Sequence, residues 1–257
     1  MNILRSFIVL IAVSFLFSCY PKKPDLSGTE VPAGPLLNML EQQRIDFTSL
    51  NALAHVEVVR GGRKRAFDTV GIILDGQQRL RLEAFGPLGE SVFALVWDGT
   101  DVLVRLPDDD RVKRPGQAGI ERVTGIRIEA KEFCALLSGT SLQPARPQDA
   151  HAYCAQDGFC VVELTEGDSV RRIRVQNAQS GKEGRIFSQE RYQSDMLVYR
   201  VRYEPTETRF PAPLFTKVVL ENPERGVLLT VEYREAEMNA PVVEGAFVLT
   251  DREERTP

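Results

Sequence analysis

Apolar and polar residues alternate along many stretches of this sequence, and short turn signals separate the stretches from one another. The alternation is clearest in Leu80–Ala84, Val102–Arg105, Leu197–Tyr203 and Leu229–Tyr233. A period of two is typical of β-strands that bury one face, and turns at this density join antiparallel neighbours. The turn signals are Asp75-Gly76, Asp98-Gly99, Asp108 to Asp110, Asp157-Gly158, Glu166-Gly167 and Arg225-Gly226. The pattern predicts an antiparallel meander rather than a parallel sheet.

Three segments depart from this period and predict helices. Residues 36–53 place apolar side chains at helical spacing without Pro or Gly, and residues 117–124 have room for two helical turns. In Ala130–Ser138 an apolar face points toward a core before Gly139 ends the helix. The predicted fold class is mainly β (α+β), with about six strands on either side of the last two helices. These strands form a single antiparallel sheet, and a few helices cover one face.

The first eighteen residues have the features of an export signal. Arg5 supplies a positive start, and Phe7–Phe17 is an apolar run shorter than the roughly 18 residues that a spanning helix needs. The sequence Leu16-Phe17-Ser18-Cys19 resembles the bacterial lipobox. That resemblance implies that Cys19 becomes the mature N-terminus and carries lipid. The alternative is an ordinary signal peptide that a cysteine happens to follow.

The segment after Cys19 is predicted to be a flexible tether, because it is rich in proline and has no apolar period. Tyr20 follows the cysteine where lipoproteins retained in the inner membrane carry Asp, which implies the outer membrane. We therefore expect four parts. These are a signal peptide at 1–18, a lipidated N-terminus and tether at 19–34, a folded domain at 35–250 and a polar tail at 251–257.

The charge balance argues against nucleic acid as a partner. The formal net charge is −4, and loss of residues 1–18 removes only Arg5, so the mature chain remains mildly acidic. Nucleic-acid binding requires clustered Lys and Arg to displace counterions, and no basic block is present. The hydrophobic content of 43% is enough to bury a core.

The cysteines fit an oxidising compartment. Cys154 and Cys160 flank a segment in which Gln156-Asp157-Gly158 suits a hairpin loop, so both sulfurs would lie on facing strands. A disulfide between them is expected, and two buried thiols are the alternative. Cys134 lies in a predicted helix and is expected to be a buried thiol.

The sequence contains no signature of catalysis or of cofactor binding. Its two histidines, His55 and His151, lie far apart, and there is no Gly-x-Ser-x-Gly elbow, zinc-protease helix, Walker loop or dinucleotide-binding loop. The run Asp108 to Asp110 is followed at once by basic residues and lacks the Gly and Glu of a calcium loop. We therefore expect no enzyme, no catalytic residue, no metal and no cofactor.

Two motifs give the chain a resemblance to a known family. One is Pro87-Leu88-Gly89, after a strand that reads Arg-x-Arg-Leu, and the other runs from Thr124-Gly125-Ile126 to Leu137-Ser138-Gly139. With the lipobox and the tether, they resemble the LolA/LolB family of lipoprotein-localisation proteins, and within it the outer-membrane receptor LolB. The resemblance implies an unclosed half-barrel with helices over its concave side. The segment Met238–Leu249 extends beyond the LolB pattern and is similar to the carrier LolA.

The resemblance also implies two functional sites. Acyl chains would lie in an apolar trough between the sheet and the helices, and a membrane-insertion loop would carry Leu88 beside Pro87. The expected trough residues are Leu80, Leu82, Phe93, Leu95, Trp97, Phe133, Leu136, Leu137, Tyr199 and Val201. The alternatives are that these residues fill a dry core and that Leu88 folds inward to plug one end of the half-barrel.

The function implied by the resemblance is lipoprotein transfer. We expect a monomer anchored to the periplasmic face of the outer membrane that binds acyl chains. It would accept lipoproteins from a soluble LolA-like carrier and insert them into outer-membrane lipid. Two other functions stay open, namely a lipid-binding module for other amphiphiles and a structural envelope lipoprotein without a ligand.

Overall fold

The computed structural model describes residues 26–107, 109–116, 118–142, 149–176, 184–205 and 215–251. The predicted signal peptide, Cys19, residues 20–25 of the predicted tether and residues 252–257 of the predicted polar tail lie outside the described residues. The described part contains these elements: β1 (Thr29–Val31), α2 (Gly34–Asp46), β2 (Ser49–Arg60), β3 (Arg63–Asp75), β4 (Arg79–Phe85), β5 (Ser91–Trp97), β6 (Val102–Leu106), β7 (Asp109–Lys113), α3 (Ala118–Thr124), α4 (Ala130–Ser138), β8 (Ala150–Cys154), β9 (Phe159–Glu166), β10 (Ser169–Gln176), β11 (Ile186–Gln193), β12 (Met196–Pro205), β13 (Phe215–Asn222) and β14 (Val227–Met238).

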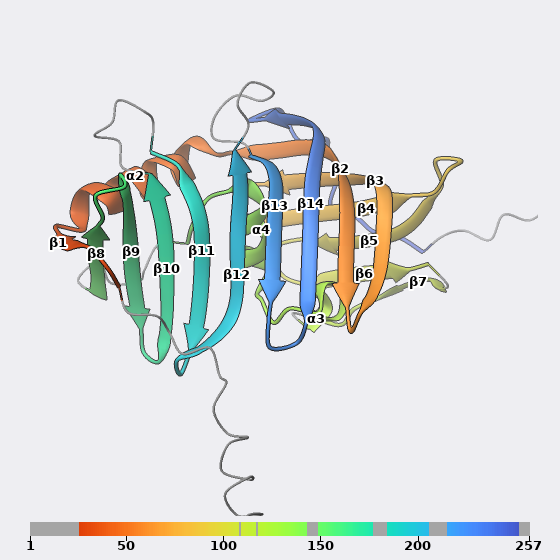
Figure 1. The fold of residues 1–257 in the computed structure, drawn as a ribbon. Helices are drawn as coiled ribbons and strands as arrows, with labels where there is room; N and C mark the ends of the chain where they lie inside the picture. Colours follow the sequence, from red (N-terminus) through yellow and green to blue (C-terminus); the bar gives the residue numbers. More distant parts are fainter. Residues whose placement is uncertain are drawn as a thin grey trace, which may run out of the picture.

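The strands form one 14-stranded sheet in the order β1-β8-β9-β10-β11-β12-β13-β14-β2-β3-β4-β5-β6-β7. Every pairing in it is antiparallel. Two meanders, β2 to β7 and β8 to β14, meet where β14 pairs with β2. The sheet curls strongly but does not close, so β1 and β7 are its two edges (Figure 1). The predicted single antiparallel sheet and unclosed half-barrel are confirmed.

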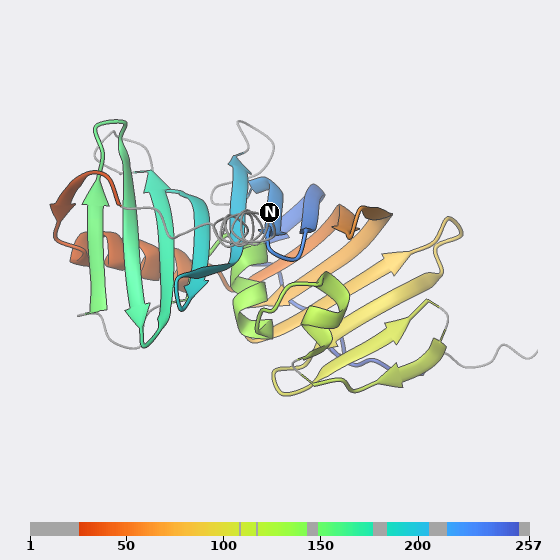
Figure 2. The same cartoon turned by 60° about the horizontal axis from the view of Figure 1, so that its bottom comes forward.

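The helices lie on the concave side of the sheet, with α2 across β8 to β11, α4 near the middle of the sheet and α3 across the other half (Figures 1 and 2). Helix α4 covers the predicted residues Ala130–Ser138, and Gly139 ends it in the left-handed region at φ 70°. In the described part of the chain, no helix is long and apolar enough to cross a membrane.

The prediction of one helix over residues 36–53 is wrong in its second half. Helix α2 ends at Asp46, and strand β2 begins at Ser49. Leu50 pairs with Leu74 of β3 and Met238 of β14, so this segment forms strand pairs on both sides. The apolar spacing there fits either structure, and the long-range pairing decides in favour of a strand.

The predicted tether is shorter than residues 19–34, because Thr29–Val31 form the edge strand β1 against β8. At Gly28 the chain passes close to the backbone of Cys154. A disulfide joins Cys154 to Cys160 across the facing positions of β8 and β9. At this edge of the sheet the disulfide joins β8 to β9, and β1 pairs with the outer side of β8.

The sheet buries apolar side chains on both faces. The larger cluster lies on the concave side, between the strands and the helices. A smaller one lies on the convex side and contains Ala94, Val96 and Leu103, which Phe247 and Leu249 of the C-terminal segment cover. The C-terminal segment that carries Phe247 and Leu249 is therefore a fixed part of the outer surface.

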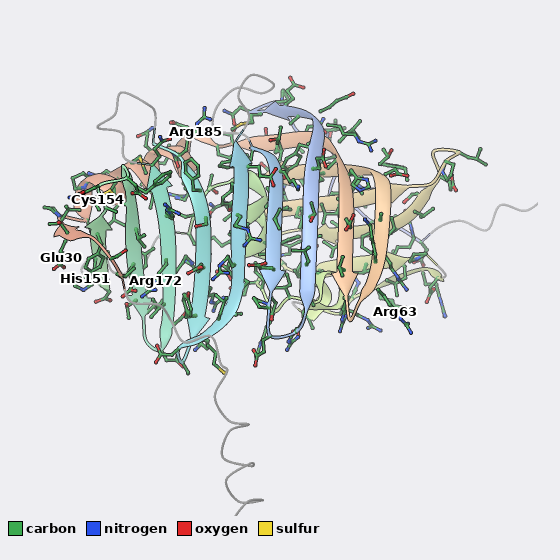
Figure 3. All side chains as sticks on the ribbon, viewed as in Figure 1. Glu30, Arg63, His151, Cys154, Arg172 and Arg185 are labelled. Atoms are coloured by element: carbon green, nitrogen blue, oxygen red, sulfur yellow. A yellow bond between two sulfur atoms is a disulfide. The ribbon has the colours of Figure 1, made fainter. Side chains whose placement is uncertain are left out.

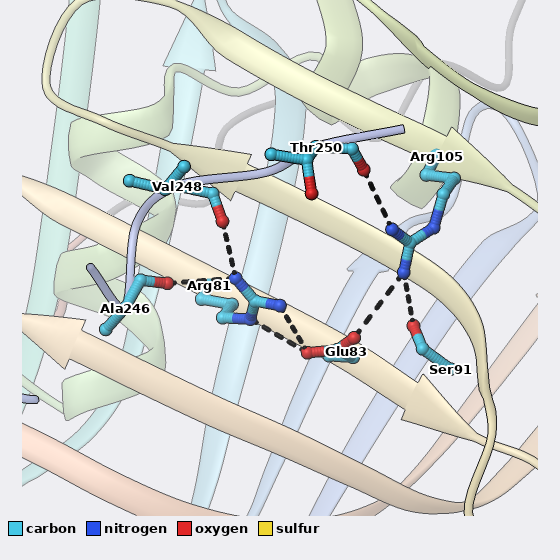
Figure 4. Close-up of polar contacts among 7 residues, drawn as sticks. All are labelled: Arg81, Glu83, Ser91, Arg105, Ala246, Val248 and Thr250. Atoms are coloured by element: carbon cyan, nitrogen blue, oxygen red, sulfur yellow. Dashed lines mark hydrogen bonds and ion pairs between the residues drawn. The ribbon is translucent and has the colours of Figure 1, made fainter. Parts of the chain in front are cut away.

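Two arginines, the partly buried Arg81 and the buried Arg105, hold this C-terminal segment (Figure 4). Arg81 donates to the carbonyl oxygens of Ala246 and Val248 at 3.0 and 3.1 Å, and Arg105 donates to that of Thr250 at 3.0 Å. The carboxylate of Glu83 lies between the two guanidinium groups and is bonded to Arg81 at 2.8 Å. An arginine of the Arg-x-Arg-Leu strand thus anchors the tail.

Candidate functional site

A cavity of about 680 Å³ lies between the concave face of the sheet and helices α3 and α4. Strands β2 to β6 and β14 form its wall, and the two helices form its cover. Its lining residues are Val56, Val58, Arg60, Gly61, Arg63, Arg65, Phe67, Val70, Ile72, Leu82, Ala84, Phe93, Leu106, Pro107, Arg122, Val123, Thr124, Phe133, Leu137, Leu229 and Val231. Apart from the arginines, Thr124 and the backbone, this lining is apolar.

Part of this apolar lining keeps some of its side-chain surface exposed. Val56, Val58, Phe67, Leu82 and Phe93 are only partly buried, although each packs against the main core cluster. The rings of Phe67 and Phe93 lie 6.3 Å apart, centroid to centroid. Large apolar side chains that are half-exposed and converge on one concavity are the usual signature of a site for an apolar ligand.

Of the ten predicted trough residues, four line this cavity: Leu82, Phe93, Phe133 and Leu137. The other six are buried in the core and are not in the lining: Leu80, Leu95, Trp97, Leu136, Tyr199 and Val201. For these six the structure shows burial in the core, and their place in an acyl-chain site stays a prediction. Helix α4 packs against β4, and the side chains under and beside it are enclosed. Alternation identifies the concave face of a strand but not the part of it that a helix covers.

The sequence reasoning missed the hairpin that supplies most of the wall. Strands β2 and β3 turn at Gly61-Gly62, both in the left-handed region with φ 56° and 74°, as a tight two-residue hairpin requires. A Gly-Gly pair between Val58-Val59 and a second alternating run was the available signal. On this hairpin, alternate residues face the cavity.

Four arginines occupy one end of the cavity. Arg60, Arg63 and Arg65 lie at the tip of the β2–β3 hairpin, and Arg122 comes from helix α3. Figure 3 shows Arg63 beside the turn between these strands. Thr69 pairs with Phe85, the last residue of β4, so the β2–β3 and β4–β5 turns lie at the same end of the sheet. Strand β3 continues from Asp68 back to Arg63 beyond the end of β4, so the arginines of the β2–β3 hairpin and the predicted membrane-insertion loop lie on the same side of the sheet but at separate places.

That loop presents Leu88 to solvent, with 94% of the residue exposed. The backbone N–H of Leu88 donates to the Glu90 carboxylate at 3.1 Å, and that of Gly86 donates to the Glu90 carbonyl at 2.8 Å. The Glu90 carboxylate fills the space where a β-carbon of residue 86 would lie, which accounts for Gly86. A turn closed by its own hydrogen bonds thus holds Leu88 and the exposed Pro87 away from the body.

Helix α4 is fixed over the sheet by a buried carboxylate. Glu132 accepts hydrogen bonds from Arg171 at 2.8 Å, Arg191 at 2.7 Å and the hydroxyl of Tyr199 at 2.7 Å. Burial, followed by the charge of Glu132, raises the pKa of Tyr199 well above its ordinary value, so the phenol stays protonated and donates. Three strands, β10, β11 and β12, are thereby tied to one helix residue.

No grouping of residues suited to metal binding occurs in the described ranges. Those ranges contain no set of three or more His, Cys, Asp or Glu side chains that converges on a metal position. His55 lies 3.2 Å from Asp68, and His151 lies 3.1 Å from Glu30, both outside the cavity lining. The cavity itself offers apolar surface and guanidinium groups.

The chain forms an unclosed antiparallel half-barrel with an apolar cavity under its helices, and these two features are the basis for comparing it with known proteins. The sequence matches no protein-family model and no curated protein. Solved structures share the fold. One is a LolA superfamily protein from Nitrosomonas europaea, with a TM-score of 0.56 and 16% identity over 85% of this chain and 98% of that one.

Two other solved structures have the same arrangement. A putative outer membrane lipoprotein-sorting protein domain from Vibrio parahaemolyticus gives a TM-score of 0.56 at 11% identity, over 84% of this chain and 97% of that one. A DUF1329 family protein from Desulfovibrio piger gives 0.50 at 13% identity over the same shares. The chain therefore has the LolA-like fold, and the likeness does not single out the LolB branch.

Proposed function

We propose that the protein binds acyl chains in the cavity between its sheet and helices α3 and α4. The observation that carries the proposal is the set of large, half-exposed apolar side chains that line the cavity, among them Val58, Phe67 and Phe93. A sixteen-carbon chain left in water costs on the order of 13 kcal/mol, at roughly 0.8 per methylene. If a methylene takes about the 30 Å³ that a water molecule takes, such a chain needs about 480 Å³. The cavity of about 680 Å³ is large enough.

We further propose that the protein acts as a monomeric lipoprotein receptor of the outer membrane. Cys19 would carry the lipid anchor, and residues 20–28 would be the tether that lets the half-barrel stand off the periplasmic face. The cavity would take the acyl chains of a lipoprotein from a soluble LolA-like carrier, and the exposed Leu88 turn would touch outer-membrane lipid during release. Transfer needs no chemical step, so no catalytic residue or cofactor is assigned.

A transfer assay tests this role. The purified lipidated protein is placed in outer-membrane-like vesicles and mixed with a carrier loaded with a radiolabelled lipoprotein. We expect label to move into the vesicles only when the protein is present. In cells, depletion should cause outer-membrane lipoproteins to accumulate on the carrier. Normal delivery in depleted cells that have no second receptor would refute the receptor role.

The arginines in the lining favour a second candidate function, which is binding of a different amphiphile such as a phospholipid. Mass spectrometry of lipids that copurify with the protein separates the two functions. Lipopeptides would support lipoprotein transfer, whereas free phospholipid would support the second function.

A further inference from the structure

We infer that the arginine end of the cavity binds the anionic group of an amphiphile whose acyl chain lies in the apolar part. The inference rests on the proposed acyl-chain binding and adds the chemical class of the ligand. Its basis is a set of four guanidinium groups, from Arg60, Arg63, Arg65 and Arg122, in the wall of one apolar cavity.

The first argument is charge. The whole chain has a net charge of −4, yet none of the residues that line this cavity is Asp or Glu. Four positive charges and no negative charge in one lining create a local field opposite in sign to that of the molecule. Such a field attracts an anionic group to this end of the cavity.

The second argument is that two nearby carboxylates are already paired. Glu57 lies on the other face of β2 and pairs with Lys64, and Glu121 pairs with Arg225 at 2.5 Å. Within the described part of the chain, none of the four cavity arginines has a side-chain hydrogen bond or an ion pair. Their donors are therefore available to a ligand, and a guanidinium binds phosphate or carboxylate through two parallel hydrogen bonds.

The third argument is the order of groups along the wall. On β2 the residues facing the cavity run from Val56 through Val58 to Arg60, and on β3 they run from Phe67 to Arg65 and Arg63. The wall thus changes from apolar to cationic over two residues of each strand, at about 3.3 Å per residue. An amphiphile with its charge next to its chain has the same order of groups, so the ligand class is an acyl chain that carries an anionic head group.

Three probes test the inference. Two are lipids with the same sixteen-carbon chain, and the third is a free anion. Binding to the purified protein is measured for palmitoyl lysophosphatidylglycerol, which is anionic, and for monopalmitoylglycerol, which is neutral. Inorganic phosphate serves as the anion without a chain. We expect the anionic lipid to bind at least about tenfold more tightly than the neutral one, the factor expected from one hydrogen bond to a charged group. Phosphate at millimolar concentration should not displace it.

The variant Arg60→Gln/Arg63→Gln/Arg65→Gln should bind both lipids equally, at the affinity of the neutral lipid. The matched control is Lys64→Gln, which removes a charge from the same hairpin but from the opposite face, and it should keep the preference. Arg63→Gln alone covers the case in which the triple variant fails to fold.

Equal binding of the anionic and neutral lipids to the native protein would overturn the inference and leave acyl-chain binding intact. Displacement by phosphate alone would also overturn it, because the site would then recognise a free anion. Failure of both lipids to bind would refute the proposed acyl-chain site itself, and the inference with it.

Discussion

The hydroxyl of Tyr199 on β12 donates a 2.7 Å hydrogen bond to the carboxylate of Glu132 on helix α4. Both residues are buried, and the same carboxylate also forms ion pairs with Arg171 and Arg191. This contact joins the helix that covers the cavity to the half of the sheet that does not line it. These directional bonds add to the apolar packing of α4 against the sheet.

Removal of the Glu132 carboxylate should therefore destabilise the fold strongly. Glu132→Ala leaves Arg171 and Arg191 near the core without their counter-ion, a situation that typically costs about 3–5 kcal/mol. Tyr199→Phe removes one hydrogen bond and should cost about 1–2 kcal/mol. Urea unfolding measures both. The exposed Glu129, at the start of the same helix, gives the control Glu129→Ala, which should change the free energy of unfolding by less than about 0.5 kcal/mol. Similar effects for Glu132→Ala and Glu129→Ala would contradict this account of α4.

The thiol of Cys134 should be unreactive in the folded protein. The residue is fully buried on α4, and burial raises the pKa of the thiol far above its ordinary value, so the reactive thiolate does not form at neutral pH. We expect a maleimide to label the Cys134 peptide only when urea unfolds the chain, as followed by mass spectrometry. Rapid labelling without urea would show that α4 opens in the native state.

The C-terminal segment should contribute to stability through two side chains on the convex face. Phe247 and Leu249 are buried there, and complete burial of such a side chain gives about 1.5–3 kcal/mol. Phe247→Ser/Leu249→Ser should therefore lower the free energy of unfolding by several kcal/mol and expose the patch around Val96. Val248 lies between the two and is 63% exposed, so Val248→Ser is a matched control that should have little effect. Equal stability of the two variants would mean that the tail is not held.

Leu88 should matter for delivery and not for folding. It is 94% exposed, so Leu88→Glu should leave the free energy of unfolding within about 0.5 kcal/mol and should not change acyl-chain binding. If the turn touches the bilayer, the same variant should abolish transfer of a lipoprotein into vesicles. Val243→Glu, at a residue 74% exposed on the C-terminal segment, is the control and should transfer normally. Normal transfer by Leu88→Glu would remove the functional role of the turn.

Alternation and turn residues predict the sheet and helices α3 and α4, because these signals act locally, whereas the open shape is implied only by the resemblance to the LolA/LolB family. It does not predict where β2 begins, since residues 47–53 fit a helix until β3 and β14 pair with them. An apolar cavity on the concave face is among the predictions, but only some of the residues predicted to line it do so. Leu82 and Phe133 line it, whereas Leu80 and Tyr199 do not. The difference depends on where α4 lies across the sheet, which is set by long-range contacts such as those of Glu132.

The central claim is that acyl chains bind in the cavity on the concave face. A photoreactive palmitate analogue tests it most directly, with cross-linked residues located by mass spectrometry. We predict saturable cross-links on residues of β2, β3, β4 and α4 that line the cavity. Val58→Trp, which fills the cavity, should abolish them, and Val59→Trp on the opposite face of β2 should not. Cross-links confined to the convex face, or equal labelling of both variants, would contradict the account.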